Sequence, residues 1–129
     1  MNSSTRTGFL IFAHGSRDPA WRVPFDHMLS MARSRVQEPV ELAFLESMEP
    51  NLTQGIQALL EQGARHIVIT PIFLAAGSHI RQDLPQLVRD IEKRLPGLHI
   101  EIQATIGENA FMQAAMVNYA LMKTSDQQH

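Results

Sequence analysis

Two short loops of this chain carry the residues with the most distinctive chemistry. One reads His14-Gly15-Ser16-Arg17-Asp18-Pro19, and the other reads Phe73-Leu74-Ala75-Ala76-Gly77-Ser78-His79-Ile80-Arg81-Gln82-Asp83. A pair of neutral imidazoles suits a borderline divalent ion such as Co²⁺, Ni²⁺, Fe²⁺ or Zn²⁺. His14 and His79 are therefore candidate metal ligands, provided the fold brings together two positions that are 65 residues apart.

The neighbours of these histidines suit an anionic ligand. Arg17 and Arg81 flank the two loops, and guanidinium groups pair well with a molecule that carries several carboxylates. The pairs Gly15-Ser16 and Gly77-Ser78 each precede an expected helix, where backbone N–H groups can bind anions. Glu46 ends an expected strand and could act as a third ligand or a proton acceptor. A solvated carboxylate at the start of a helix is the alternative for Glu46.

A single histidine at a strand end is more often a hydrogen-bonded structural residue than a ligand. Two histidines at corresponding loops of one sheet favour a functional role instead. The remaining histidines have no such placement, and Glu49 is expected to be a solvated carboxylate. We therefore expect surface or structural roles for His27, His66, His99 and His129.

The elements that must position these loops are visible in the hydrophobic pattern. Short apolar runs without alternation are typical of strands buried on both faces of a parallel sheet, and they occupy residues 8–13, 40–45, 66–72 and 98–102. Apolar residues at helical spacing lie between and after these runs, in residues 25–36, 52–60, 84–95 and 108–122. Asn51 is predicted to cap the second helix, and Gly63 to follow its end.

A strand followed by a helix, four times over, predicts an α/β fold with three layers. The parallel sheet has helices on both faces and the strand order 2-1-3-4. The second and fourth strands each contain a glutamate, which predicts exposed edge strands. In this order the crevice beyond the carboxyl ends of strands one and three is the expected ligand site. His14 and His79 follow those two strands.

Composition limits the function. The chain has 129 residues, of which 44% are hydrophobic, so we expect one domain (8–122) between a flexible N-terminus (1–7) and a polar tail (123–129). A net charge of -2 argues against a nucleic-acid partner, and the absence of cysteine excludes a cysteine-bound iron–sulfur cluster. No glycine-rich nucleotide motif occurs. Without a targeting or membrane pattern, the cytoplasm is the expected compartment and no membrane partner is expected.

Three motifs, in this order, resemble the sirohydrochlorin chelatases, and more closely their short CbiX-type form. The resemblance extends over nearly the whole chain, from about residue 8 to 122. It is carried by residues 10–19, by residues 41–46 with Pro50, and by residues 71–80.

The resemblance implies a chelatase (flavodoxin-like) fold and an enzyme that works without ATP. Such enzymes insert Co²⁺, or in relatives Fe²⁺ or Ni²⁺, into sirohydrochlorin on the way to cobalamin or sirohaem. The two metal-site histidines of the family fall on His14 and His79, and Glu46 matches an acidic position. One imidazole, with Glu46, is then expected to accept pyrrole protons as the ion enters. Co²⁺ is the expected metal.

Size and the last helix predict a homodimer. A domain of 129 residues offers only one wall for a wide macrocycle, so two copies facing each other would form the cleft. The last helix is also more apolar than a single packed face requires. Its apolar residues are Phe111, Ala114, Ala115, Val117, Tyr119, Leu121 and Met122.

Two other functions are compatible with these residues. The same crevice could hold a tetrapyrrole or a metal ion without turnover, as a binding or delivery protein does. A phosphoryl-transfer enzyme with His14 as the nucleophile is a third hypothesis. It is disfavoured because only Arg17 is near His14 in the sequence, whereas that chemistry needs a basic cluster.

Overall fold

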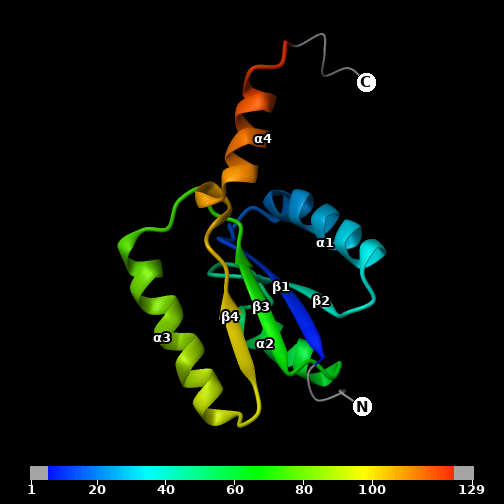
Figure 1. Ribbon diagram of the computed structural model, residues 1–129, viewed down its shortest axis with the longest axis vertical. Helices are drawn as coiled ribbons and strands as arrows, with labels where there is room; N and C mark the ends of the chain where they lie inside the picture. The colour runs from blue at the N-terminus through cyan, green and yellow to red at the C-terminus, as the bar shows by residue number, and fades with distance from the viewer. Residues whose placement is uncertain (1–5, 124–129) are drawn as a thin grey trace.

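The computed structural model describes residues 6–123 and contains a four-stranded parallel sheet (Figure 1). The predicted strand order is confirmed: β2-β1-β3-β4. The elements along the chain are β1 (Thr7–Ala13), η2 (Pro19–Arg22), α1 (Val23–Arg35), β2 (Val40–Phe44), α2 (Leu52–Glu61), β3 (His66–Pro71), α3 (Ser78–Arg94), β4 (His99–Ile102), η3 (Ile106–Glu108) and α4 (Ala110–Ala120).

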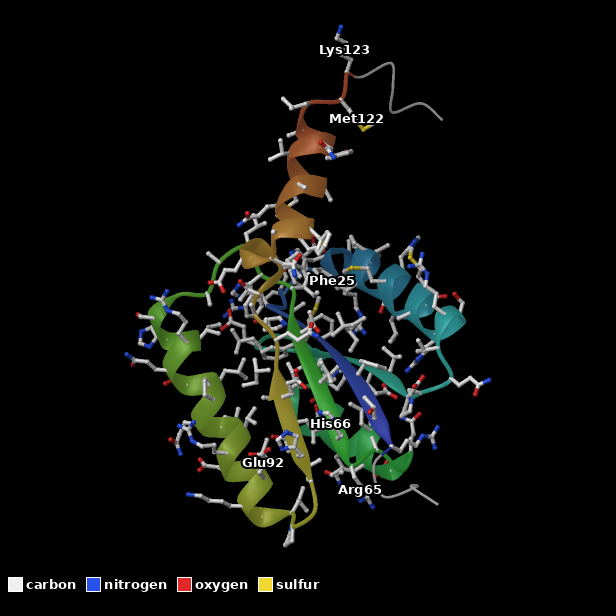
Figure 2. All side chains as sticks on the ribbon, in the orientation of Figure 1. Phe25, Arg65, His66, Glu92, Met122 and Lys123 are labelled. Atoms are coloured by element: carbon white, nitrogen blue, oxygen red, sulfur yellow. The ribbon has the colours of Figure 1, made fainter. Side chains whose placement is uncertain are left out.

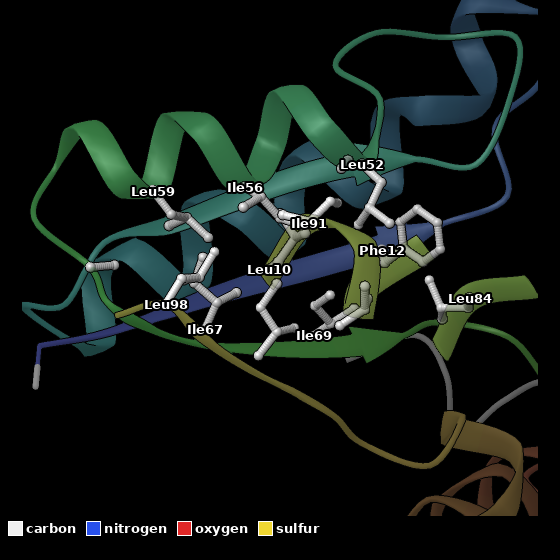
Figure 3. Close-up of a cluster of buried hydrophobic side chains, with 14 of the residues drawn as sticks. Leu10, Phe12, Leu52, Ile56, Leu59, Ile67, Ile69, Leu84, Ile91 and Leu98 are labelled. Atoms are coloured by element: carbon white, nitrogen blue, oxygen red, sulfur yellow. The ribbon is translucent and has the colours of Figure 1, made fainter. Parts of the chain in front are cut away.

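Helices cover both faces of the sheet, as predicted. On one face α2 and α3 pack against alternate strand residues, and this forms the main core (Figure 3). Its buried residues include Leu10, Phe12, Ile56, Leu59, Ile67, Ile69, Leu84, Val88 and Ile91. On the other face Phe25 and Leu29 of α1 pack against Leu42 and Phe44 of β2. The three layers follow from the strand pattern, because successive side chains of a strand point to opposite faces.

Local signals determine where α2 begins and ends. The Asn51 side chain accepts a hydrogen bond from the backbone N–H of Gln54, and the Gln54 side chain accepts one from the N–H of Asn51. This reciprocal arrangement satisfies two N–H groups that a helix start leaves unpaired. Gly63, with φ at +95°, follows the end of the helix. Both predictions for this helix are confirmed.

Helix α3 begins earlier than its apolar pattern predicted. The periodic residues start at Leu84, but the helix starts at Ser78, with Gly77 as its N-cap. The first turn and a half carries mostly polar residues that face solvent, so hydrophobic periodicity does not reveal it. As a consequence His79 lies on a helix and not in the loop where we expected it.

Two smaller expectations were wrong. Thr7, assigned to the flexible N-terminus, is the first residue of β1 and pairs with His66 of β3. β2 is an edge strand as predicted, but it is not exposed, because α1 and α2 pack against its two faces and bury most of its residues. β4 is the more exposed edge.

Helix α4 does not return to the sheet. It projects beyond the carboxyl ends of the strands (Figure 1), and none of its residues is buried. The preceding turn η3 is held against the loop after β3, where the Gly107 N–H donates to the Phe73 carbonyl at 3.0 Å. An apolar character on all sides gives α4 no preferred face, so its sequence does not specify where it packs.

Within residues 6–123, no helix is long and apolar enough to cross a membrane.

Candidate metal and macrocycle site

The loop after β1 and the loop after β3 meet at the carboxyl ends of these two neighbouring strands. Phe12 pairs with Pro71 in the register, and the Ile72 N–H donates to the Phe12 carbonyl at 2.7 Å. Just beyond, the His14 ring packs on the Phe73 ring with their centroids 4.1 Å apart. The loop after β1 and the loop after β3 are thus in direct contact, as the strand order requires.

The loop after β2 is bonded to the loop after β1. The backbone N–H groups of Leu45 and Glu46 donate to the carbonyls of Ala13 and His14 at 2.8 and 3.0 Å. Gly15 makes this approach possible. Its φ is +93°, and a Cβ atom at this position would overlap the carbonyl oxygen of Glu46. The backbone of Glu46 is therefore held directly beside that of His14.

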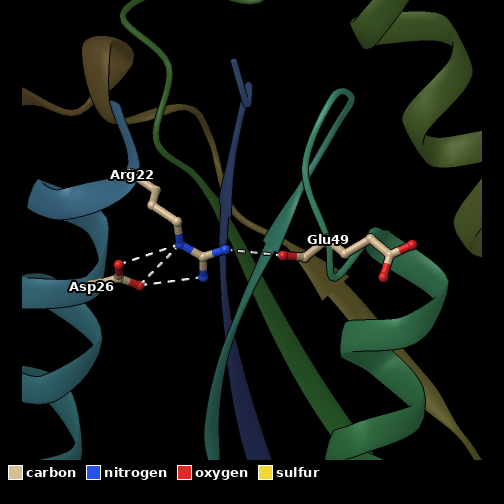
Figure 4. Close-up of polar contacts among 3 residues, drawn as sticks. All are labelled: Arg22, Asp26 and Glu49. Atoms are coloured by element: carbon tan, nitrogen blue, oxygen red, sulfur yellow. Dashed lines mark hydrogen bonds and ion pairs between the residues drawn. The ribbon is translucent and has the colours of Figure 1, made fainter. Parts of the chain in front are cut away.

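Arg22 anchors the loop after β2 at its end nearest α2 (Figure 4). Its guanidinium pairs with Asp26 at 3.2 Å and donates to the backbone carbonyl of Glu49 at 3.1 Å. It also lies over the ring of Phe44, 4.9 Å from its centroid. These contacts connect the start of α1 with the loop that carries Glu46.

A cavity of about 470 Å³ opens at this edge of the sheet. Residues of α3, the start of α2, the loop after β2 and the end of β1 line it. Most of its wall is apolar, from Phe12, Leu45, Leu52, Ile80, Leu84 and Leu87. Its polar residues are Glu46, Asn51, Thr53, His79 and Asp83.

The structure brings two of the three predicted catalytic residues to this cavity. His79 of α3 and Glu46 of the loop after β2 both line it. His14 is not among the lining residues, although it is connected to the cavity wall through the Glu46 backbone. All three side chains are exposed. Their roles as ligands or bases stay predictions.

The other predicted ligand-binding residues have mixed surroundings. The Ser16 hydroxyl accepts from the Asp18 N–H, and the Asp18 carboxylate caps η2, so local bonds already occupy this turn. Arg17 is exposed. At the second loop, Gly77 caps α3 without a side-chain bond and Ser78 opens the helix, which leaves a start suited to an anion. Arg81 lines a separate cavity of about 150 Å³. Ligand binding by these residues stays a prediction.

The histidines given surface or structural roles lie elsewhere, except His129, which is outside the described residues. His27 is an exposed residue of α1. His66 and His99 pair in the register of β3 and β4, with ring centroids 5.2 Å apart. His66 and Glu92 lie at one end of the molecule, and Met122, just after α4, lies at the opposite end (Figure 2). None of His27, His66 and His99 lines the cavity, and their surface or structural roles stay predictions.

Asp83 belongs to the same segment as His79, but its sequence context indicated no role for it. It lies four residues after His79 on α3 and lines the same cavity. Helical spacing alone would have placed the two side chains on one face, had the helix start been recognised. Within residues 6–123 no group of three or more histidine, aspartate or glutamate side chains is arranged to hold a metal ion.

Comparison with known proteins identifies the family of this site. A family model described as CbiX matches residues 8–121. The chain belongs to the CbiX family. It is 35% identical over 106 residues to the sirohydrochlorin cobaltochelatase of Saccharolobus solfataricus, covering 78% of this chain and 80% of that protein. It is also 32% identical over 101 residues to the chloroplastic sirohydrochlorin ferrochelatase of Arabidopsis thaliana, covering 78% of this chain and 45% of that protein.

Solved structures of the family have the same fold. A cobalamin (vitamin B12) biosynthesis CbiX protein of Marinobacter aquaeolei superposes with a TM-score of 0.77 and 28% identity, covering 88% of this chain and 93% of that one. The sirohydrochlorin chelatase SirB of Bacillus subtilis subspecies spizizenii, in complex with cobalt, gives 0.76 and 27% over 90% of this chain and 50% of that one. This CbiX-family chain therefore spans about half of SirB and nearly all of the short family member. The predicted resemblance to short CbiX-type chelatases is confirmed.

Proposed function

We propose that this CbiX-family chain is a metallochelatase that inserts a divalent metal ion into sirohydrochlorin without ATP. The observation that carries the proposal is the apolar cavity at the carboxyl edge of the sheet. His79 and Glu46, from separate elements, line it, and His14 lies beside Glu46. Relatives named as sirohydrochlorin cobaltochelatase and ferrochelatase support this substrate.

The chemistry requires a ligand for the ion and acceptors for protons. Two pyrrole N–H bonds of the macrocycle break as bonds from the metal to the ring nitrogens form, and two protons leave. The apolar wall packs against the macrocycle face, and His79 and His14 present the ion. Glu46 accepts one of the two protons, and the imidazole that the ion leaves as it enters the ring accepts the other, because an imidazole nitrogen still bound to the metal has no lone pair left for a proton. Arg17 and Arg81 pair with carboxylates at the rim of the macrocycle.

A metal panel tests the activity and the metal together. The purified chain is mixed with sirohydrochlorin and Co²⁺, Fe²⁺ or Ni²⁺, and the change in the pigment spectrum is followed over many equivalents. We expect repeated turnover, fastest with Co²⁺. Relatives with either cobalt or iron in their names leave Fe²⁺ as the alternative. A single stoichiometric spectral change would instead indicate the non-catalytic binding or delivery protein.

Substitution of the two histidines tests the site. His14→Ala and His79→Ala are each expected to abolish catalysed insertion and to leave the far-UV circular dichroism unchanged, because both side chains are exposed. His99→Ala is the matched control, since this exposed histidine lies at the amino end of β4. Insertion at the wild-type rate by both site variants would contradict the mechanism.

We further propose that the working unit is a homodimer held by α4. Phe111, Tyr119 and Leu121 expose 87%, 65% and 76% of their surface, which is unusual for side chains of this size. On the sheet face beside α1, a groove of about 330 Å³ is lined largely by apolar residues, among them Phe9, Ile11, Met28 and Met31. Helix α4 of a second copy is of the right chemistry to fill such a groove.

A charge on α4 tests the dimer. Leu121→Lys is expected to produce monomers in sedimentation and to lower insertion at the same time, because burying an unpaired ammonium costs several kcal/mol. Gln57→Lys, which adds the same charge on an exposed residue of α2 on the other face of the sheet, is the control. A fully active monomer at working concentration would refute the proposal.

The cytoplasm stays the predicted compartment.

A further inference from the structure

A second, smaller cavity lies between the start of α3 and the segment that follows β4. Its volume is about 150 Å³, and we call it the small cavity. Ile80 and Leu84 line both this cavity and the main one, so the two cavities share an apolar partition. The rest of its apolar wall comes from Pro71, Ala76, Pro85, Ile102 and Ala104.

A buried hydroxyl group in the wall of the small cavity lacks a hydrogen-bond partner. Thr105 lines this cavity and is only 5% exposed, and its Oγ1 atom has no partner among residues 6–123. Thr105 is also the N-cap residue of η3, but its side chain does not make the capping bond. Buried hydroxyl groups are normally paired, so an unpaired one at a cavity wall indicates a ligand that occupies the cavity.

The charges around the small cavity favour an anion. Ala76 and Ile80 line it from either side of the start of α3. Gly77 provides no side-chain cap, so the first N–H groups of this 17-residue helix and the positive end of its dipole lie beside the cavity. Arg81 adds a guanidinium group, and Glu108 carries the opposing charge among the lining residues.

We propose that the small cavity binds a carboxylate group carried on a short carbon chain. The Thr105 O–H and the Arg81 guanidinium donate to the carboxylate, which only accepts hydrogen bonds, and the apolar wall contacts the chain. About 150 Å³ is the space of about five water molecules, and a propionate group has about as many non-hydrogen atoms.

Two sources of such a group share this chemistry. One is a carboxylate-bearing side chain of a macrocycle held in the main cavity, since the two cavities are separated only by the Ile80 and Leu84 partition. The other is a free small acid. The inference rests on the proposed function for the first source only, because a free acid binds whether or not the chain is a chelatase.

Propionate tests the small cavity without the macrocycle. The full-length chain, labelled with ¹⁵N, is titrated with sodium propionate at constant ionic strength, and the amide signals of Ile80, Arg81 and Thr105 are followed by NMR. We expect saturable shifts in the wild type, and at least about fivefold weaker binding in Thr105→Val, which loses a hydrogen bond to a charged group. Thr105→Ser keeps the hydroxyl and should bind within about twofold of the wild type.

Two controls accompany this titration. Thr7→Val makes the same substitution in a half-buried residue at the amino end of β1 and should leave propionate binding unchanged. Propionamide has the same shape as propionate without its charge, so it should not saturate the same signals. Equal saturation by propionamide would overturn the carboxylate assignment.

Two charge changes with opposite expected effects test the electrostatics. Arg81→Gln should weaken propionate binding by about threefold or more, and Glu108→Gln should strengthen it by about twofold, because the first removes an attractive charge and the second a repulsive one. Both side chains are exposed, so both variants should fold. Weaker binding in Glu108→Gln, no saturable binding in the wild type, or wild-type affinity in both Thr105→Val and Arg81→Gln would each overturn the proposal.

Competition identifies the source of the carboxylate. If a macrocycle side chain occupies the small cavity, propionate competes with metal-free sirohydrochlorin for the wild type, and Thr105→Val binds the pigment about tenfold more weakly. If a free acid is the ligand, propionate and the pigment bind together. The insertion assay reports separately on the proposed function. No turnover with any metal refutes the chelatase, whereas normal turnover without propionate binding refutes only the small-cavity site.

Discussion

Alanine in place of Gly15 perturbs the contact that holds Glu46 beside His14. Gly15 has φ at +93°, in a region that side-chain-bearing residues adopt at a cost. Its Cβ atom would overlap the Glu46 carbonyl oxygen and lie 3.1 Å from the carbonyl carbon. The hydrogen bond that the Glu46 N–H donates to the His14 carbonyl, 3.0 Å long, involves the same two loop backbones. The substitution must therefore separate the two loops or break this bond.

Two other glycines allow the expected loss of stability in Gly15→Ala to be divided into a backbone part and a contact part. Gly97 has φ at +90° and Gly77 has φ at -70°, and a Cβ atom on either would meet nothing within 4 Å. We expect Gly77→Ala to change the free energy of unfolding by less than about 0.5 kcal/mol, because lost N-cap preference offsets reduced chain entropy. Gly97→Ala should cost about 1 kcal/mol from the backbone alone. Gly15→Ala should cost about 2–3 kcal/mol, because a lost hydrogen bond and a displaced loop add to that strain.

Urea unfolding and metal insertion measure the two consequences. For a domain of this size 2–3 kcal/mol lowers the urea midpoint by about 1–2 M. Displacement of the Glu46 backbone is expected to lower kcat/KM for insertion by about 10–100-fold in Gly15→Ala. Gly97→Ala should keep its activity. Equal midpoints for Gly15→Ala and Gly97→Ala would show that the overlap with Glu46 has no energetic effect and would refute this reasoning.

Three further substitutions have expected outcomes that thermal or urea unfolding can check. Asn51→Ala removes the cap of α2 and should cost about 1 kcal/mol, with Gln54→Ala costing less; equal effects would contradict the capping geometry. Arg22→Met loses the bond to the Glu49 carbonyl and an exposed ion pair, for a total of about 1–2 kcal/mol, and an unchanged midpoint would show that this anchor is dispensable. The Thr105 hydroxyl is buried and has no hydrogen-bond partner among residues 6–123. Thr105→Val should therefore be neutral or stabilising, and a loss above about 1 kcal/mol would mean the hydroxyl is satisfied in solution.

Residues close together in the sequence predicted most of the elements. Continuous apolar runs identified the four strands, because a strand covered on both faces needs no polar alternation. The Asn51 cap and Gly63 are local signals that act within a few residues, and both were recognised. The order of elements then determined which strand ends are neighbours, and so which loops meet. This reasoning placed His14, Glu46 and His79 at one edge of the sheet.

Contacts between distant residues escaped this reasoning. Burial of β2 depends on α1 and α2 together, so the single glutamate of this strand wrongly predicted that the strand is exposed. Gly15 was interpreted as an anion-binding glycine, whereas its contact with the Glu46 carbonyl explains why a side chain does not fit. Asp83 received no role because the polar start of α3 concealed the helix that places it beside His79.

The sequence by itself determined the strands, the helix caps, the strand order and the edge of the sheet that carries the chemistry. These follow from local conformational preferences and from the short connections of an alternating α/β chain. Only the tertiary structure decided which side chains share the cavity and where α4 points. The cavity walls come from four elements that are separate in the sequence, and α4 is apolar on every side, so neither outcome is encoded in a local pattern. Both depend on which surfaces remain uncovered once the sheet and its helices have packed.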